Sequence, residues 1–149
     1  MPEIELREFR PDDREGCLAV LDANTPDYFA PVERAAFEEF LDNPPGTYLV
    51  LVDDGRVVGC GGYFTLPETR DARTSWGMVH PDYKGRGLDK RLFQARLDAV
   101  RERGDADRIC VITAPKTESF FARYGFEVTR REKDGNAPGI DLVEMWLEL

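Results

Sequence analysis

A short basic stretch, "HPDYKGRGLDKRLF" (80–93), stands out in a chain that otherwise carries a formal net charge of −9. Four cationic side chains in it surround two glycines: Lys84, Arg86, Lys90 and Arg91 around Gly85 and Gly87. Glycines let a backbone approach a ligand closely, and the unpaired amides at a helix start attract anions. The stretch therefore predicts a phosphate or pyrophosphate site, with an ordinary strand-to-helix connection as the alternative.

The glycine spacing excludes two common phosphate-binding turns. The Walker pattern needs GxxxxGK[ST], and the dinucleotide-binding pattern needs GxGxxG. Here Gly85 and Gly87 are followed by Leu88, Asp89 and Lys90, which fit neither pattern.

The elements that must position this turn follow from hydrophobic periodicity. Alternation predicts a strand over 4–9, and helical spacing predicts helices over 12–24 and 32–43. Asp54-Gly55 predicts a hairpin turn within 47–66. A third strand in this region is expected over 72–81, ended by Pro81.

The remaining elements begin within the basic stretch and follow it. A long amphipathic helix is expected over 88–104, with its apolar side chains at Leu88, Leu92, Phe93, Ala95, Leu97 and Val100. A buried strand at 108–113, a short helix at 117–125, and strands at 126–132 and 140–149 joined by a loop complete the chain. The order β-α-α-β-β-β-α-β-α-β-β predicts a single domain over 1–149, of the α/β class with an α+β mixed sheet.

The composition and net charge of the chain exclude several classes of partner and site. A net charge of −9 excludes nucleic acid as a general partner. No apolar run is long enough to span a membrane, and the first residues do not resemble a signal peptide, so we expect a cytoplasmic protein. One histidine and the scattered Cys17, Cys60 and Cys110 give little material for a metal site, and we expect none. Cys60 and Cys110 are expected to be buried strand residues.

Two sequence blocks carry a family resemblance. "VHPDYKGRGLDKRLF" resembles the acetyl-CoA signature of the GNAT acetyltransferases, (Arg/Gln)-x-x-Gly-x-(Gly/Ala) after a V-x-P strand end. Lys84, Gly87 and Asp89 fill the first position, the central glycine and the last position. "ESFFARYGFE" (118–127) is similar to the later Phe-Tyr-x-x-x-Gly-Phe helix of the family, and the order of elements matches over nearly the whole chain.

The resemblance implies a GNAT-like acyl-CoA N-acyltransferase fold and acetyl-CoA as co-substrate. The implied reaction is direct acetyl transfer, in a ternary complex, to a primary amine of a small molecule or to a peptide or protein amino group. The alternative is a non-catalytic module that binds acyl-CoA or a protein partner. A homodimer is compatible with the resemblance.

The resemblance also implies roles for individual residues. The strand end should bind the pantetheine arm, the glycine turn should hold the pyrophosphate, and the Met78 amide should polarise the thioester carbonyl. The residues expected at the cofactor are Met78, Val79, His80, Lys84, Gly85, Arg86, Gly87, Leu88, Asp89, Lys90 and Phe121. Tyr28, Phe29 and Trp76 are expected at the amine site, with core or interface packing as their alternative.

This chain departs from the family pattern in its acid and base. The family often protonates the departing thiolate with the Tyr of its Phe-Tyr pair, but Phe121 stands at that position. Tyr124 is the substitute we predict, with a packing role as its alternative. The signature strand has no carboxylate where some members place a Glu. Glu68 and Asp71, acting through water, are the candidates for the base, or else solvated acids, and His80 is a further candidate. Asp89, where the family prefers Gly or Ala, should weaken phosphate binding.

Overall fold

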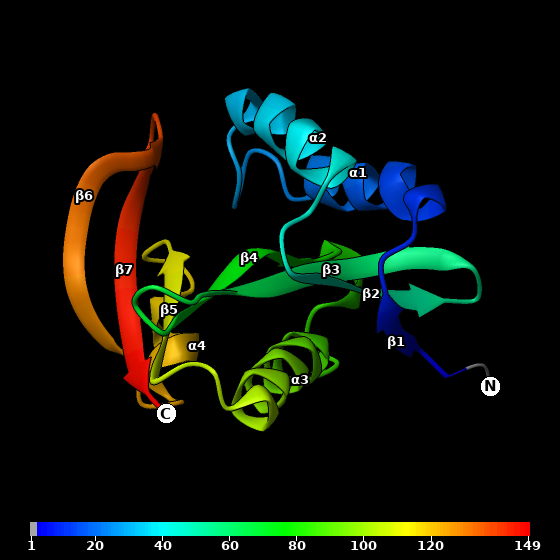
Figure 1. Cartoon of the computed structure of the whole chain (residues 1–149). Helices are drawn as coiled ribbons and strands as arrows, with labels where there is room; N and C mark the ends of the chain where they lie inside the picture. Colours follow the sequence, from blue (N-terminus) through cyan, green and yellow to red (C-terminus); the bar gives the residue numbers. More distant parts are fainter. Residues whose placement is uncertain (1–2) are drawn as a thin grey trace.

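The computed structural model describes residues 3–149 and contains a seven-stranded mixed sheet with helices on both faces (Figure 1). The strands lie in the order β1-β2-β3-β4-β5-β7-β6. The strands are β1 (Glu5–Glu8), β2 (Thr47–Asp53), β3 (Arg56–Leu66), β4 (Asp71–Val79), β5 (Arg108–Thr113), β6 (Glu127–Ala137) and β7 (Ile140–Glu148). The helices are α1 (Arg14–Ala23), α2 (Arg34–Asp42), α3 (Leu88–Arg103) and α4 (Glu118–Ala122).

The expected mixed α/β architecture is confirmed, with three short 3-10 turns added. Each of these turns starts at a proline and leads toward a helix: Pro11–Asp13, Pro31–Glu33 and Pro81–Tyr83. Proline favours the first turn of a helix because its ring fixes φ and no amide hydrogen is needed there. Helices α1 and α2 cover one face of the sheet, and α3 and α4 lie against the other (Figure 1).

The two halves of the sheet diverge between β4 and β5. These parallel strands pair only where Asp71–Arg73 face Arg108–Cys110, and β5 then continues beside β7. From position 74 onward, β4 keeps β3 as a neighbour and pairs with no other strand among residues 3–149. A gap between two arms of the sheet therefore opens beside the end of β4.

A bulge interrupts β4 beside this gap. The register with β3 shifts between Cys60 and Gly62, and Trp76 has a φ of 39°. That φ is rare for a residue with a side chain. The Tyr48 hydroxyl donates to the Trp76 carbonyl at 2.8 Å and so ties the bulge to β2 from the α1 side.

The core is divided by the sheet. On the α3 side, Phe93 is fully buried and is surrounded by Phe120, Phe121, Tyr124 and Phe126, with ring centres 4.8–6.0 Å away. The other face buries mainly the apolar sides of α1 and α2. Cys60 and Cys110 are buried, as the sequence predicts. Within residues 3–149, no helix is both long and apolar enough to cross a membrane.

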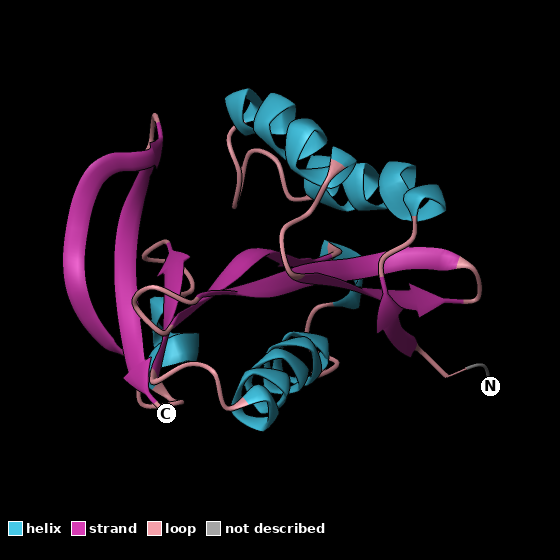
Figure 2. Ribbon diagram, in the orientation of Figure 1, coloured by secondary structure: helices cyan, strands magenta, loops and turns pink. Residues whose placement is uncertain are grey.

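The last hairpin is longer than the sequence suggests. A loop was expected over 133–139, but β6 runs to Ala137, and the β6–β7 hairpin curves beside β5 (Figure 2). Side chains hold the backbone of this segment in place. Asp134 Oδ1 accepts from the Gly139 amide at 2.8 Å, and Asn136 Nδ2 donates to the Asp141 carbonyl at 3.0 Å and to the Thr113 carbonyl at 3.0 Å.

A buried carboxylate paired with an exposed arginine, where β4 and β5 begin to pair, predicts acid sensitivity. Asp71 is 3% exposed and accepts from Arg108 Nε at 2.7 Å, which holds the pKa of Asp71 below its ordinary value of 3.8. A carboxylate with a lowered folded-state pKa stabilises the protein above its unfolded-state pKa, and this contribution disappears as pH falls through the folded-state value. We expect Asp71→Asn to lower the melting temperature at pH 7 and to reduce its decline between pH 5 and pH 2.5. Thermal melts at these pH values check this, and an unchanged decline would contradict it.

Candidate active site

The glycine turn leaves open space at the start of α3. Gly85 and Gly87 have φ values of 82° and 76°, in the region that favours glycine, and a Cβ on either would meet no atom within 4 Å. Gly87 is the N-cap of α3, so the next amides have no acceptor within the helix. The open space and the free backbone N–H groups suit an anionic group, and the pyrophosphate site at this turn stays a prediction.

The cationic side chains around the glycine turn contact different groups. Lys84 Nζ lies 3.9 Å from the centre of the Tyr28 ring, and the Arg86 guanidinium lies 4.5 Å from that of Tyr83. Arg91 Nη1 donates to the Ile4 carbonyl at 2.6 Å. Lys90 and Asp89 are both exposed in the first turn of α3. Arg91 therefore anchors the chain before β1, while Lys84, Arg86 and Lys90 stay near the cradle.

The backbone direction along β4 decides which groups face the gap. The His80 amide donates to the Val58 carbonyl at 2.8 Å, and Met78 pairs with Cys60. Because backbone groups alternate along a strand, those of Met78 and His80 face β3, and those of Gly77 and Val79 face the open edge. This register differs from the expectation for Met78: its amide faces β3, and the Gly77 amide is the one that faces the gap. The Val79 carbonyl already accepts from Asn24 Nδ2 at 3.1 Å.

Helix α4 and the turn after it bring two of the expected residues to the same aromatic cluster. Phe121 is half-buried with its ring centre 5.1 Å from that of Phe93, and the Tyr124 ring centre lies 4.8 Å from Phe93. The Tyr124 hydroxyl is buried and has no hydrogen-bond partner among the residues that the structure describes. Burial raises the pKa of Tyr124, so the hydroxyl keeps its proton at neutral pH.

The residues expected at the amine site lie on the α1 side of the bulge. The Phe29 ring stacks on Trp76 with centres 6.0 Å apart, and Trp76 also packs on Phe37 at 4.8 Å. Tyr28 lies between Lys84 and Lys116, whose Nζ is 5.2 Å from the Tyr28 ring centre. The link between α1 and α2 thus reaches both the glycine turn and the loop after β5.

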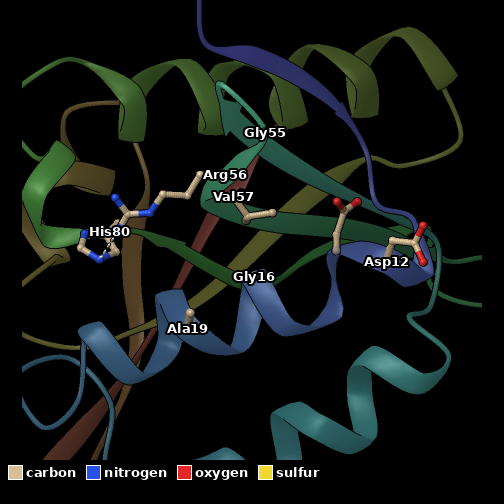
Figure 3. A pocket seen from close by; sticks show the side chains of 8 residues that line it. Asp12, Gly16, Ala19, Gly55, Arg56, Val57 and His80 are labelled. Atoms are coloured by element: carbon tan, nitrogen blue, oxygen red, sulfur yellow. Dashed lines mark hydrogen bonds between the residues drawn. The ribbon is translucent and has the colours of Figure 1, made fainter.

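His80 points away from the gap. Its ring lines a pocket of about 340 Å³ between α1 and the β2–β3 hairpin (Figure 3), which also includes Asp12, Asp13, Gly16, Ala19, Gly55, Arg56 and Val57. His80 Nδ1 accepts from the Asp82 amide at 3.1 Å, and Nε2 lies 3.2 Å from Arg56 Nη2. Both ring nitrogens thus face groups other than the backbone amides of the glycine turn.

The two candidate carboxylate bases are also displaced from the bulge. Asp71 is committed to its ion pair with Arg108, and Glu68 is exposed in the turn before β4, at the opposite end of this strand from Val79. Among residues 3–149, no group of three or more His, Cys, Asp or Glu side chains is placed to hold a metal ion.

One residue beside the bulge was missed by the sequence analysis. The apolar face of α3 was expected to include Ala95, but the structure leaves Ala95 half-buried and buries Arg96 to 5% exposure. Arg96 follows Phe93 by three residues and precedes Val100 by four, which places it on the buried side of the helix. This spacing on α3, together with glycine-rich strands, could have indicated from the sequence that Arg96 is buried.

Comparisons with known proteins identify the family and the fold of the chain. The model of the acetyltransferase (GNAT) domain matches residues 17–149. A Bacillus subtilis (strain 168) protein with the provisional name [ribosomal protein bS18]-alanine N-acetyltransferase is 25% identical over 117 residues, 76% of each chain.

Two solved structures share the fold. A GNAT-family protein from Desulfovibrio desulfuricans has a TM-score of 0.83 at 21% identity, covering 98% of this chain and 99% of that one. A Salmonella typhimurium protein solved with its cofactor acetyl-CoA has a TM-score of 0.73 at 17% identity, covering 99% of this chain and 94% of that one.

Proposed function

The chain belongs to the GNAT acetyltransferase family and uses acetyl-CoA as co-substrate, and we propose that it acetylates a primary amine by direct transfer in a ternary complex. The observation that carries this proposal is the unpaired edge of β4, which ends beside the open glycine turn at the start of α3. A long ligand with a pyrophosphate at one end and a polar, amide-containing arm matches both features.

The cofactor is proposed to bind along this edge. The amides from Gly85 to Lys90 hold the pyrophosphate, with Lys84 and Arg86 adding positive charge. The pantetheine arm extends along the open edge of β4, where the Gly77 backbone and the Val79 amide face the gap, while the Val79 carbonyl accepts from Asn24. Asp89 adds a negative charge near this site and so weakens pyrophosphate binding. In the first turn of α3, the same carboxylate interacts favourably with the helix dipole.

The chemistry needs few protein groups. A neutral amine attacks the thioester carbon, and the carbonyl π electrons move to oxygen, where the Gly77 amide stabilises the oxyanion. When the intermediate collapses, the carbon–sulfur bond breaks and its electron pair goes to sulfur. The new amide nitrogen loses its extra proton to water. Tyr124 is proposed to protonate the thiolate, and positioning of the reactants supplies much of the rate.

The acceptor is proposed to enter beside the bulge, near Tyr28, Phe29 and Trp76. The B. subtilis relative is named for acetylating the alanine of a ribosomal protein, so a peptide amino terminus is one acceptor to test, and small amines are the other. A homodimer and a cytoplasmic location stay predictions, which sedimentation and cell fractionation would check.

The second candidate function is a module that binds acyl-CoA without transferring the acyl group. Phe121 favours it, because the family's usual proton donor is missing at that position. Thiol release from acetyl-CoA across a panel of peptides and small amines separates the two. Release that depends on the amine supports the enzyme, and binding without release supports the module.

We expect Tyr124→Phe to lower kcat by about 10- to 100-fold, because the departing thiolate then has no nearby proton donor. The KM for acetyl-CoA should change little, since the hydroxyl has no binding partner in the described chain. Adding Phe121→Tyr in the Tyr124→Phe background should restore part of the lost rate. Steady-state kinetics of the single and double variants checks this, and an unchanged kcat in Tyr124→Phe would remove Tyr124 as the acid.

A further inference from the structure

Arg96 is a buried cation without a counter-ion. Among residues 3–149, no carboxylate lies within ion-pair distance of its guanidinium. Within the described part of the chain, its one hydrogen bond runs from Nη1 to the Gly62 carbonyl at 3.4 Å, and Nε is buried with no partner. Burial lowers the pKa of Arg96 to about 10, and Asp89, two helical turns away, opposes this shift through its charge. Arg96 therefore stays positively charged at neutral pH.

The guanidinium lies directly beneath the bulge. A Cβ on Gly77 would lie 2.9 Å from Arg96 Nη2, and a Cβ on Gly61 would lie 3.1 Å from Arg96 Cζ. Alanine at either position would crowd the guanidinium, so the two glycines leave the space that it fills. From the other face, the Tyr48 hydroxyl holds the Trp76 carbonyl. The bulge is thus held between a cation on the α3 side and a hydroxyl on the α1 side.

This arrangement is unfavourable for stability. A buried charge without a partner is costly, and apolar replacements of buried ionic groups are often neutral or stabilising. The Arg96 site is already apolar on one side, where its Cζ lies 5.4 Å from the Phe93 ring centre. A methionine would fill similar space without the charge. A negative charge that forms nearby during the reaction would give this cation a favourable interaction that the resting protein lacks.

We propose that Arg96 is a positioning residue for acetyl transfer, which fixes the Gly77 segment and stabilises the oxyanion electrostatically through it. This proposal rests on the function proposed above, in which that oxyanion forms at the Gly77 amide. Arg96 forms no bond to substrate and exchanges no proton. A fixed charge in a low-dielectric site contributes more to a developing charge than the same group in water.

The test compares Arg96→Met and Arg96→Lys with wild type. We expect Arg96→Met to lower kcat by about 10- to 100-fold, while the Kd for acetyl-CoA stays within about threefold. Its melting temperature should stay the same or rise, because an unpaired buried charge is removed. Arg96→Lys keeps the charge and should recover much of kcat. Arg101→Met, on the exposed part of the same helix, makes the same change in net charge and should behave like wild type.

Other results would overturn the proposal. An unchanged kcat in Arg96→Met would do so, as would a parallel loss of melting temperature, acetyl-CoA affinity and kcat that Arg96→Lys does not relieve. If Arg96→Met does not fold, Arg96→Gln keeps hydrogen bonding without the charge, and a wild-type rate in that variant would equally refute the role. Failure of the proposed function is distinguishable, because wild type would then release no thiol with any amine.

Discussion

Replacing Gly87 with leucine should abolish acetyl-CoA binding in the micromolar to millimolar range. Gly87 has a φ of 76° and lies at the start of α3, where an added Cβ would extend into open space. In the proposed complex the pyrophosphate occupies that space, so a side chain would displace it from the helix amides. We expect the Kd from isothermal titration to rise at least about 100-fold, since several charge-assisted hydrogen bonds are lost together.

Backbone strain is the effect that must be separated from this loss. Gly104 ends the same helix with a φ of 67° and equally open surroundings, so Gly104→Leu imposes similar strain far from the turn. Each substitution should lower stability by about 1–2 kcal/mol. Only Gly87→Leu should lose its affinity for acetyl-CoA. Equal affinity of the two variants would show that the pyrophosphate binds elsewhere.

Phe93→Ala should have the largest effect on stability. Phe93 has no exposed surface, and its ring contacts Phe121 and Tyr124 of the α4 region. Removing it leaves a cavity, and we expect the free energy of unfolding measured in urea to fall by about 3–5 kcal/mol. Because the same ring holds α4 beside α3, kcat should fall in the fraction that stays folded.

Phe93→Leu is the control for this prediction, since it restores most of the volume without the ring. Its loss of stability should be clearly smaller than that of Phe93→Ala. Equal losses in the two variants would mean that the aromatic contacts, and not the filled volume, dominate at this position.

Elements with strong local patterns could be predicted from the sequence. Asp54-Gly55 marks the β2–β3 hairpin, and the nearly all-apolar 108–113 segment matches β5. The glycine turn was also placed correctly, because its neighbours are set by local chemistry: a proline ends the strand and a helix follows. The extension of β6 was missed since side chains such as Asn136 bind backbone groups of distant segments, which no local pattern reveals.

The site depends on features that sequence order does not encode. Which backbone amide faces the gap depends on how β4 pairs with β3, and this pairing turns the Met78 amide toward β3 and the Gly77 amide toward the open edge. Arg96 was passed over because an arginine within an apolar helical face is ordinarily solvated. Arg96 can be buried because Gly61 of β3 and Gly77 of β4 have no side chains and leave room for the guanidinium.

The most direct test of the central claim is amine-dependent thiol release from acetyl-CoA by the wild-type protein. The panel contains peptides with different amino-terminal residues and small primary amines, and mass spectrometry identifies the acetylated product. The account predicts release above the solvent background with at least one amine, and loss of that release in Gly87→Leu but not in Gly104→Leu. Tight binding of acetyl-CoA with no release from any amine, or release that survives in Gly87→Leu, would contradict it.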